Sequence, residues 1–218
     1  RLTAFSTSIL SQASGAPNVA AKVATRLVSA NLMGHDSHGV GMIPAYVEGI
    51  LAEQLIPNGT ATIVQDKGPF LLVDGNQGFG HIVAEQAMEF AINRARINHF
   101  AVLSLRNSFH LGRLGDWGAM AAEAGFICIL YANVLSARPI VAPFGGSDAR
   151  FVTNPYCTAI PATEKHPMFL LDMATSTIAM GKARVADLSG NQVPEGSVID
   201  KNGNPTTDPS VMFDESGG

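Results

Sequence analysis

The segment His35-Asp36-Ser37-His38-Gly39 places two histidines, a carboxylate and a hydroxyl between two apolar stretches. A histidine near its ordinary pKa can give or take a proton at neutral pH, and an adjacent serine can hold a substrate oxygen. His38 with Ser37 is therefore the first candidate for an acid/base site. His35 and His38 could instead bind a metal ion, as in a metal-dependent hydrolase, although no third ligand is evident. A plain helix end, with His35 and Asp36 as capping groups, is the third interpretation.

A second polar segment, Asn107-Ser108-Phe109-His110-Leu111-Gly112, follows an apolar strand pattern. Ligands of open α/β sheets bind beyond the carboxyl ends of strands. Asparagine, serine and histidine at such a place could donate to a phosphate or a carboxylate, and the next helix N-terminus could face an anion. An ordinary helix-capping loop would explain the same residues without a function.

Two weaker segments lie further along the chain. Thr153-Asn154-Pro155 is a turn pattern. The segment Leu171–Ser176 is predicted to be a strand end that leads into a helix, with Ser176 as its N-cap. Asp172 would be either a helix-entry group or a ligand group, and Lys182 on the helix could reach an anion.

The apolar periodicity predicts an α/β fold: a helical N-terminal region, residues 1–58, followed by a mixed-sheet α/β/α domain, residues 59–218. The glycine-rich turn at 74–80 has glycines at 75, 78 and 80, which does not fit G-x-G-x-x-G, so a Rossmann fold is not expected. The predicted helices span 2–14, 19–33, 43–54, 81–97, 113–124 and 176–187. The predicted strands span 61–64, 70–74, 100–105, 126–132, 156–161 and 167–171, and an irregular region follows from 188.

Composition narrows the class of protein. The 218 residues are 46% hydrophobic and 15% charged, with a net charge of −4, which argues against a nucleic-acid partner. No apolar run is long enough for a membrane span, and no signal peptide is evident. Cys128 and Cys157 lie in strand patterns and are expected to be buried thiols in a reducing, cytoplasmic compartment. Because the sequence begins inside a helical pattern and stops at Gly217-Gly218, it is expected to be part of a longer protein.

Four segments in this order resemble the malate/L-lactate dehydrogenase family of the non-Rossmann type. That family includes ureidoglycolate, sulfolactate and diketogulonate dehydrogenases or reductases and a branch of cyclic imine reductases. The matching segments are His35-Asp36-Ser37-His38-Gly39-Val40, Asn107-Ser108-Phe109-His110, Thr153-Asn154-Pro155 and Asp172-Met173-Ala174-Thr175-Ser176.

The resemblance implies a hydride transfer between NAD or NADP and a small 2-oxo or 2-hydroxy acid, on a mixed α/β fold, in a homodimer. By the resemblance, His38 would be the proton donor in reduction and the base in oxidation, with Ser37 in support. The implied cofactor-lining residues are His110, Leu111, Gly112, Arg113, Leu114, Asp172, Met173 and Ala174. The residues implied near the substrate are Thr153, Met180 and Gly181, and Lys182 is a further candidate.

Two positions depart from the family pattern. Met42 stands where several members have an arginine that suits a substrate carboxylate, and Lys182 stands where some have an acidic residue. Arg113, Lys182 or an arginine outside this sequence would then hold the carboxylate, or the substrate differs. The ending Glu215-Ser216-Gly217-Gly218 resembles the approach to a further glycine-rich stretch of the cofactor site.

The sequence thus predicts a nicotinamide-dependent oxidoreductase for a 2-hydroxy or 2-oxo acid. A cyclic imine reductase, in which His38 would protonate nitrogen, is the alternative within the family. The metal-dependent hydrolase and a binding protein whose cofactor site has decayed are the alternatives outside it.

Overall fold

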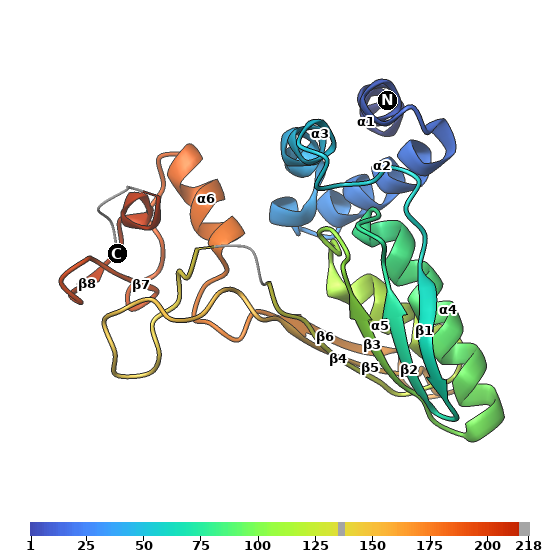
Figure 1. Ribbon diagram of the computed structural model, residues 1–218. Helices are drawn as coiled ribbons and strands as arrows, with labels where there is room; N and C mark the ends of the chain where they lie inside the picture. Colours follow the sequence, from blue (N-terminus) through green and yellow to red (C-terminus); the bar gives the residue numbers. More distant parts are fainter. Residues whose placement is uncertain (135–137, 214–218) are drawn as a thin grey trace. The chain divides into compact units, whose positions relative to one another are not determined.

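The structure is a computed structural model that describes residues 1–134 and 138–213 (Figure 1). The chain divides into two compact units. Unit 1 comprises Arg1–Cys128 and Ala159–Phe169, and unit 2 comprises Ile129–Thr158 and Leu170–Gly218. This division differs from the expected one at residue 58, because the N-terminal helices share a core with the α/β part that follows them.

Three helices open unit 1: α1 (Leu2–Ser14), α2 (Pro17–Leu32) and α3 (Ile43–Leu51). All three were predicted, and no end differs from its predicted position by more than three residues. Helix α2 begins at Pro17, which suits the first helical position because it has no N–H to satisfy. The core between the three helices is fully buried at Leu10, Leu27 and Tyr46, and Phe79 and Ile82 complete it.

The first sheet has the order β1-β2-β3, with β1 (Thr62–Lys67), β2 (Phe70–Asp74) and β3 (Val102–Arg106). Strands β1 and β2 are antiparallel, whereas β2 and β3 are parallel, so the sheet is mixed, as predicted. The crossover from β2 to β3 is helix α4 (Gly80–Asn98), which lies along the sheet in Figure 1. Its Ala87 packs against Leu71 and Val73, which closes this part of the core.

The loop after β3 leads into helix α5 (Leu114–Glu123). A second sheet follows, with the order β4-β5-β6, and the unit boundaries fall within its strands. Cys128 is half-buried in β4 and Cys157 is buried in β5. The strands are β4 (Cys128–Tyr131), β5 (Tyr156–Ile160) and β6 (Phe169–Met173).

Unit 2 also contains helix α6 (Met180–Leu188), which packs on residues near the end of the described chain. Its core is Ala183 with Val193 and Val198. The region after 188 was expected to be irregular, yet it holds a short antiparallel pair, β7 (Val198–Ile199) with β8 (Pro205–Thr206), and the 3₁₀ turn η3 (Pro209–Met212).

The predicted start of α6 at Ser176 was wrong. The helix begins at Met180 with Ala179 as its N-cap, and no side chain caps it. Ser176 instead donates its hydroxyl to the Ile178 carbonyl at 2.8 Å, because a serine can hydrogen-bond nearby backbone in a turn as readily as at a cap. The ending Glu215–Gly218 lies outside the described residues.

Within the described ranges, no helix combines the length and apolar character that crossing a membrane requires.

Candidate active site

His38 ends a short 3₁₀ turn, η1 (Asp36–His38), between α2 and α3. Its ring is half-buried, and its Nδ1 lies 3.0 Å from the Ser37 hydroxyl. The predicted pairing of Ser37 with His38 is therefore present. The His35 ring lies 6.2 Å from that of His38 in an edge-on arrangement. His35 is the N-cap position of the turn, but its side chain makes no capping bond.

Asn31, in the last turn of α2, holds the turn that carries His38. Its Oδ1 accepts from the Val40 N–H at 2.9 Å, and its Nδ2 donates to Asp36. The backbone of Gly39 runs so close that a Cβ there would overlap the Asn31 amide. One side chain thus ties the residues on both sides of His38 to α2, and it needs glycine at 39 to do so.

Replacing Asn31 with alanine is expected to lower stability by about 1–3 kcal/mol, because the Val40 N–H loses its acceptor. Activity should fall as well, since the His38 turn is no longer tied to α2. Asp36→Ala removes only the second Asn31 bond and leaves the Val40 bond in place, so it should retain more of both properties. Urea unfolding and steady-state rates of the two variants check this; equal losses in both would show that the Val40 bond does not matter.

His110 lies against His38 although 72 positions separate them in the chain. The two rings stack with centroids 5.4 Å apart and an angle of 24° between their planes. The Tyr46 hydroxyl, from α3, lies 2.8 Å from His110 Nδ1. The first and second polar segments of the sequence therefore meet in unit 1 as one histidine pair.

Burial determines the protonation states of Tyr46 and His110. Burial raises the pKa of the Tyr46 hydroxyl, so the phenol keeps its hydrogen. Burial, and then the charge of His38, lowers the pKa of His110 to about 4. Among the described residues, His110 is the one hydrogen-bond partner of the Tyr46 hydroxyl. We therefore assign Tyr46 as the donor to His110 Nδ1, which leaves His110 neutral with its proton on Nε2.

Stability should fall as the pH falls from about 6.5 towards 4. Burial, followed by the charges of His110, Arg26 and His38, also lowers the pKa of His81 to about 3. An unfolded histidine titrates near pH 6.5, so in this window the unfolded chain binds more protons than the folded one. Each of these two histidines then lowers the free energy of unfolding by up to about 1.4 kcal/mol per pH unit. Above pH 6.5 both histidines are neutral in the folded and the unfolded chain, and their contribution to the free energy of unfolding is fully present.

Urea midpoints measured between pH 7.5 and 4.5 check this expectation. His110→Gln should flatten the pH dependence, whereas His166→Gln, at an exposed position, should leave it unchanged. Identical slopes for the parent and the His110 variant would contradict the assignment.

The glycine-rich turn that does not fit a dinucleotide fingerprint serves as the support of His110. Gln77 N–H donates to the Asn107 carbonyl at 2.7 Å, and Phe109 N–H donates to the Gly78 carbonyl at 3.1 Å. At Gly80, a Cβ would lie 2.6 Å from the Phe109 carbonyl oxygen and would overlap that of His110. The turn and the His110 loop are therefore packed backbone against backbone.

Other residues of the His110 loop are engaged within unit 1. The Asn107 amide donates to Asp74 at 2.9 Å, and the Ser108 hydroxyl donates to the Phe109 carbonyl at 2.7 Å. Neither caps α5, whose N-cap is Arg113. The Arg113 guanidinium is buried and donates from Nε to Asp116 at 3.0 Å. Gly112 and Leu114 are buried, whereas Leu111 is half-buried.

The third and fourth segments meet in unit 2. The Thr175 hydroxyl donates to the Asn154 carbonyl at 3.1 Å, which joins Thr153-Asn154-Pro155 to the end of β6. Asp172 and Met173 belong to β6, and Met180, Gly181 and Lys182 form the first turn of α6. The side chain of Lys182 is exposed. The candidate residues thus form two groups, one in each unit.

Two further findings bear on the expected chemistry. Met42, at the position of the expected arginine, packs half-buried on the core of α1–α3. Across residues 1–134 and 138–213, no three His, Cys, Asp or Glu side chains gather as metal ligands would. The pairing of His35 with His38 therefore has no third ligand in the described part of the chain.

Sequence reasoning missed three residues of this site: Asn31, Tyr46 and His81. Tyr46 fits the apolar face of α3, and its partner His110 lies 64 positions away, so local periodicity could not single it out. The signal that could have found Asn31 is a polar side chain at a helix end just before a glycine-containing turn.

Comparison with known proteins places the chain in a family. A sequence profile described as malate/L-lactate dehydrogenase matches residues 1–218. The L-lactate dehydrogenase of Cupriavidus necator is 44% identical over 201 residues, which are 92% of this chain and 58% of that protein. The chain thus spans a little over half the length of that relative. It belongs to the malate/L-lactate dehydrogenase family, as the four segments predicted.

Solved structures agree with the fold. An Escherichia coli structure described as a malate/lactate dehydrogenase superposes with a TM-score of 0.92 at 42% identity, covering 100% of this chain and 60% of that one. The Δ1-piperideine-2-carboxylate reductase of Pseudomonas syringae superposes with a TM-score of 0.86 at 28% identity, covering 98% and 63%. The non-Rossmann α/β fold is therefore confirmed.

Proposed function

We propose that the protein transfers a hydride between NAD(P)(H) and a small 2-hydroxy or 2-oxo acid, with His38 as proton donor and acceptor. The observation that carries the proposal is the stacked pair of His38 and His110, in which Ser37 contacts one ring and Tyr46 the other. Family membership supports the substrate class, since the matching profile is described by malate and L-lactate. A homodimer in the cytoplasm is part of the proposal, on the resemblance to the family alone.

The two histidines take different roles because their surroundings differ. His110 is neutral at neutral pH, so it cannot supply a proton as an imidazolium, but its Nε2–H can donate a hydrogen bond. His38 has a hydroxyl at its Nδ1, whereas His110 has the Tyr46 phenol there. In reduction, the carbonyl carbon of the acid gains a hydride, its oxygen gains the electron pair of the C=O bond, and His38 delivers the proton to that oxygen. In oxidation, His38 removes the hydroxyl proton.

When bound, the nicotinamide cofactor supplies or accepts the hydride. The residues present fit such a group, because the neutral His110 next to the site can lie beside a positively charged nicotinamide without repulsion. His110 and Leu111 have half-buried side chains, and the buried Gly112, Arg113 and Leu114 are proposed to contribute backbone. In unit 2, Asp172, Met173 and Ala174 are proposed to line the cofactor, and Thr153, Met180 and Gly181 the substrate.

Lys182 is proposed to hold the substrate carboxylate. This chain has two candidate cations for the substrate carboxylate. Arg113 is buried against Asp116, whereas Lys182 is exposed. Lys182→Met is expected to raise KM for the acid by about tenfold or more, with a smaller effect on cofactor affinity, because a charge-assisted hydrogen bond is lost. Lys201→Met, an exposed lysine of the same unit, is the matched control. Equal KM values in both variants would reject Lys182.

A cyclic imine reductase is the second candidate, favoured by the likeness to piperideine-2-carboxylate reductase. His38 would then protonate the nitrogen of the imine. The experiment that tests the proposal is an NADH and NADPH oxidation assay of the complete protein with pyruvate, oxaloacetate and Δ1-piperideine-2-carboxylate. Turnover of an oxo acid supports the dehydrogenase, turnover of the imine alone supports the reductase, and no turnover with either class overturns both.

A further inference from the structure

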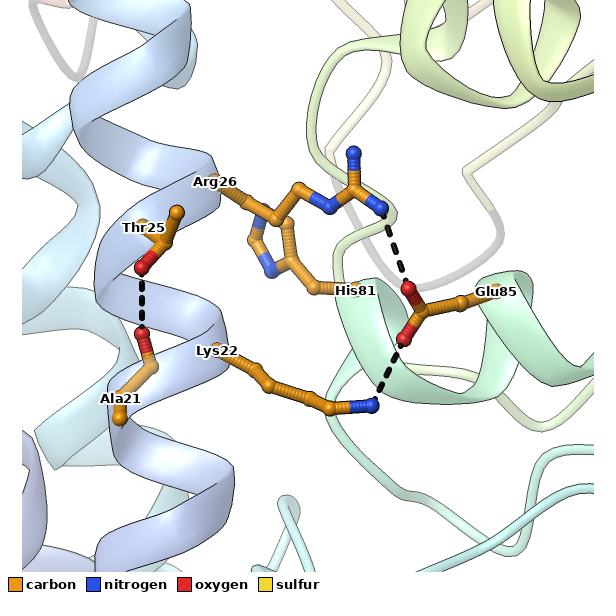
Figure 2. A pocket seen from close by; sticks show the side chains of 6 residues that line it. All are labelled: Ala21, Lys22, Thr25, Arg26, His81 and Glu85. Carbon is orange, nitrogen blue, oxygen red and sulfur yellow. Dashed lines mark hydrogen bonds and ion pairs between the residues drawn. The ribbon is translucent and has the colours of Figure 1, made fainter. Parts of the chain in front are cut away.

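A cavity that is lined mainly by charged and polar residues lies between α2 and the first turns of α4 in unit 1 (Figure 2). Its volume is about 350 Å³. It is lined by Ala21, Lys22, Thr25, Arg26, His81 and Glu85. Apart from His81, whose ring also contacts Tyr46 and His110, these residues have no part in the candidate active site.

The charges around this cavity are mainly positive. Lys22 and Arg26 each bond one oxygen of the Glu85 carboxylate at 3.2 Å. The single Glu85 carboxylate therefore forms ion pairs with two cations. Arg26 also stacks over Trp117, with 5.2 Å from its central carbon to the ring centroid, and its Nη1 lies 4.0 Å from Asp116. These contacts fix the guanidinium at the edge of the cavity.

His81 brings a buried nitrogen with no protein partner. The residue is 3% exposed, and within the described ranges its Nδ1 makes no hydrogen bond. Its Nε2 is on the side that packs against Gly112. In Figure 2 the ring extends from α4 towards α2, behind the side chain of Arg26 and above that of Lys22. A buried polar atom of this kind is expected to have a partner, and the cavity that His81 lines is the place for one.

We propose that this cavity is a binding site for a small oxyanion, a phosphate or a carboxylate, held by Lys22, Arg26 and the Nδ1–H of His81. An ammonium and a guanidinium both retain N–H groups beyond the single bond that each makes to Glu85. The neutral tautomer of His81 with its hydrogen on Nδ1 supplies a third donor. Three donors that converge from two helices, two of them charged, match the acceptor oxygens of such an anion.

The same arrangement disfavours a cation. Among the described residues that line the cavity, Glu85 is the one carboxylate, and it already bonds both Lys22 and Arg26. A further positive charge would be repelled by these two side chains. Water alone could satisfy His81 Nδ1, but it would leave the excess positive charge unchanged. Because the His81 ring contacts Tyr46 and His110, an anion bound here would lie one side chain away from the candidate active site.

The test is a titration of the complete protein with inorganic phosphate and, in a second arm, with malonate, both at constant ionic strength. Binding is followed by calorimetry and by the ¹⁵N resonance of His81 Nδ1. Lys22→Ala removes one donor at an exposed position and is expected to weaken binding about tenfold. Lys67→Ala removes the same charge elsewhere in unit 1 and should leave affinity unchanged. Glu85→Gln removes the competing carboxylate and should strengthen binding.

The two arms identify the anion, since saturable binding of one probe with a shift at His81 assigns the site to that class. Several results would overturn the proposal: no saturable binding of either probe, equal weakening by Lys22→Ala and Lys67→Ala, or no gain in affinity with Glu85→Gln. None of these readouts depends on turnover, so the result stands apart from the proposed dehydrogenase activity.

Discussion

His38→Ala is expected to lower kcat by about 10²–10⁴-fold, the usual contribution of a positioned acid or base. Cofactor affinity should change little, because the residues proposed to line the cofactor lie on the loop after β3 and in unit 2. Stopped-flow rates of hydride transfer, together with fluorescence titration of NADH and NADPH, separate the two effects.

The matched control is His35→Ala, which removes the neighbouring imidazole of the same turn. Its ring lies 6.2 Å from that of His38 and makes no capping bond. We expect its kcat to stay within about threefold of the parent, as is usual for a residue without a role in proton transfer. Full activity in His38→Ala would remove the catalytic assignment, and equal losses in both variants would point to a merely structural turn.

Gly80→Ala is expected to cost the protein both stability and activity. Alanine is a better helix former than glycine, so propensity alone would predict a gain of up to about 1 kcal/mol. The new Cβ, however, would lie 2.6 Å from the Phe109 carbonyl oxygen and overlap that of His110. Backbone atoms cannot rotate aside, so the His110 loop must move, at a cost of about 1–3 kcal/mol. A displaced His110 no longer stacks on His38, and we expect kcat to fall by about 10²-fold.

Gly41→Ala is the control for this change. Gly41 lies in the short turn between His38 and α3, and a Cβ there would meet no other atom within 4 Å. It should be as stable and as active as the parent within error. Chemical denaturation and kcat of the two variants check the pair. An active, stable Gly80→Ala protein would show that the close packing of the turn on the loop is unimportant.

The sequence predicted the elements of unit 1 well because their signals are local. Apolar residues recur at helical spacing in α1 to α4, and Pro17 starts α2. The prediction of the start of α6 was wrong for the same reason. Ser176 has the local pattern of an N-cap, yet its hydroxyl donates to the Ile178 carbonyl. The short pair β7–β8 was missed because two-residue strands have no periodicity to detect.

The site was predicted less completely, since its contacts join distant parts of the chain. The resemblance singled out His38 and His110, but nothing in the sequence indicated that their rings stack. The partner of His110 is Tyr46, which has the pattern of a core residue on α3. The glycine-rich turn was correctly excluded as a dinucleotide fingerprint, but its function as the support of His110 requires the positions of backbone atoms that only the fold provides.

The central claim is that His38 carries the proton, and rescue by added imidazole tests it most directly. The complete protein with His38→Ala is assayed with its oxo acid and reduced cofactor, with and without imidazole, and His110→Ala is assayed beside it. We predict that imidazole restores turnover in His38→Ala, with a pH dependence that follows the titration of the added base, and does not restore it in His110→Ala. Rescue of His110→Ala but not of His38→Ala would contradict the assignment and transfer the role to His110.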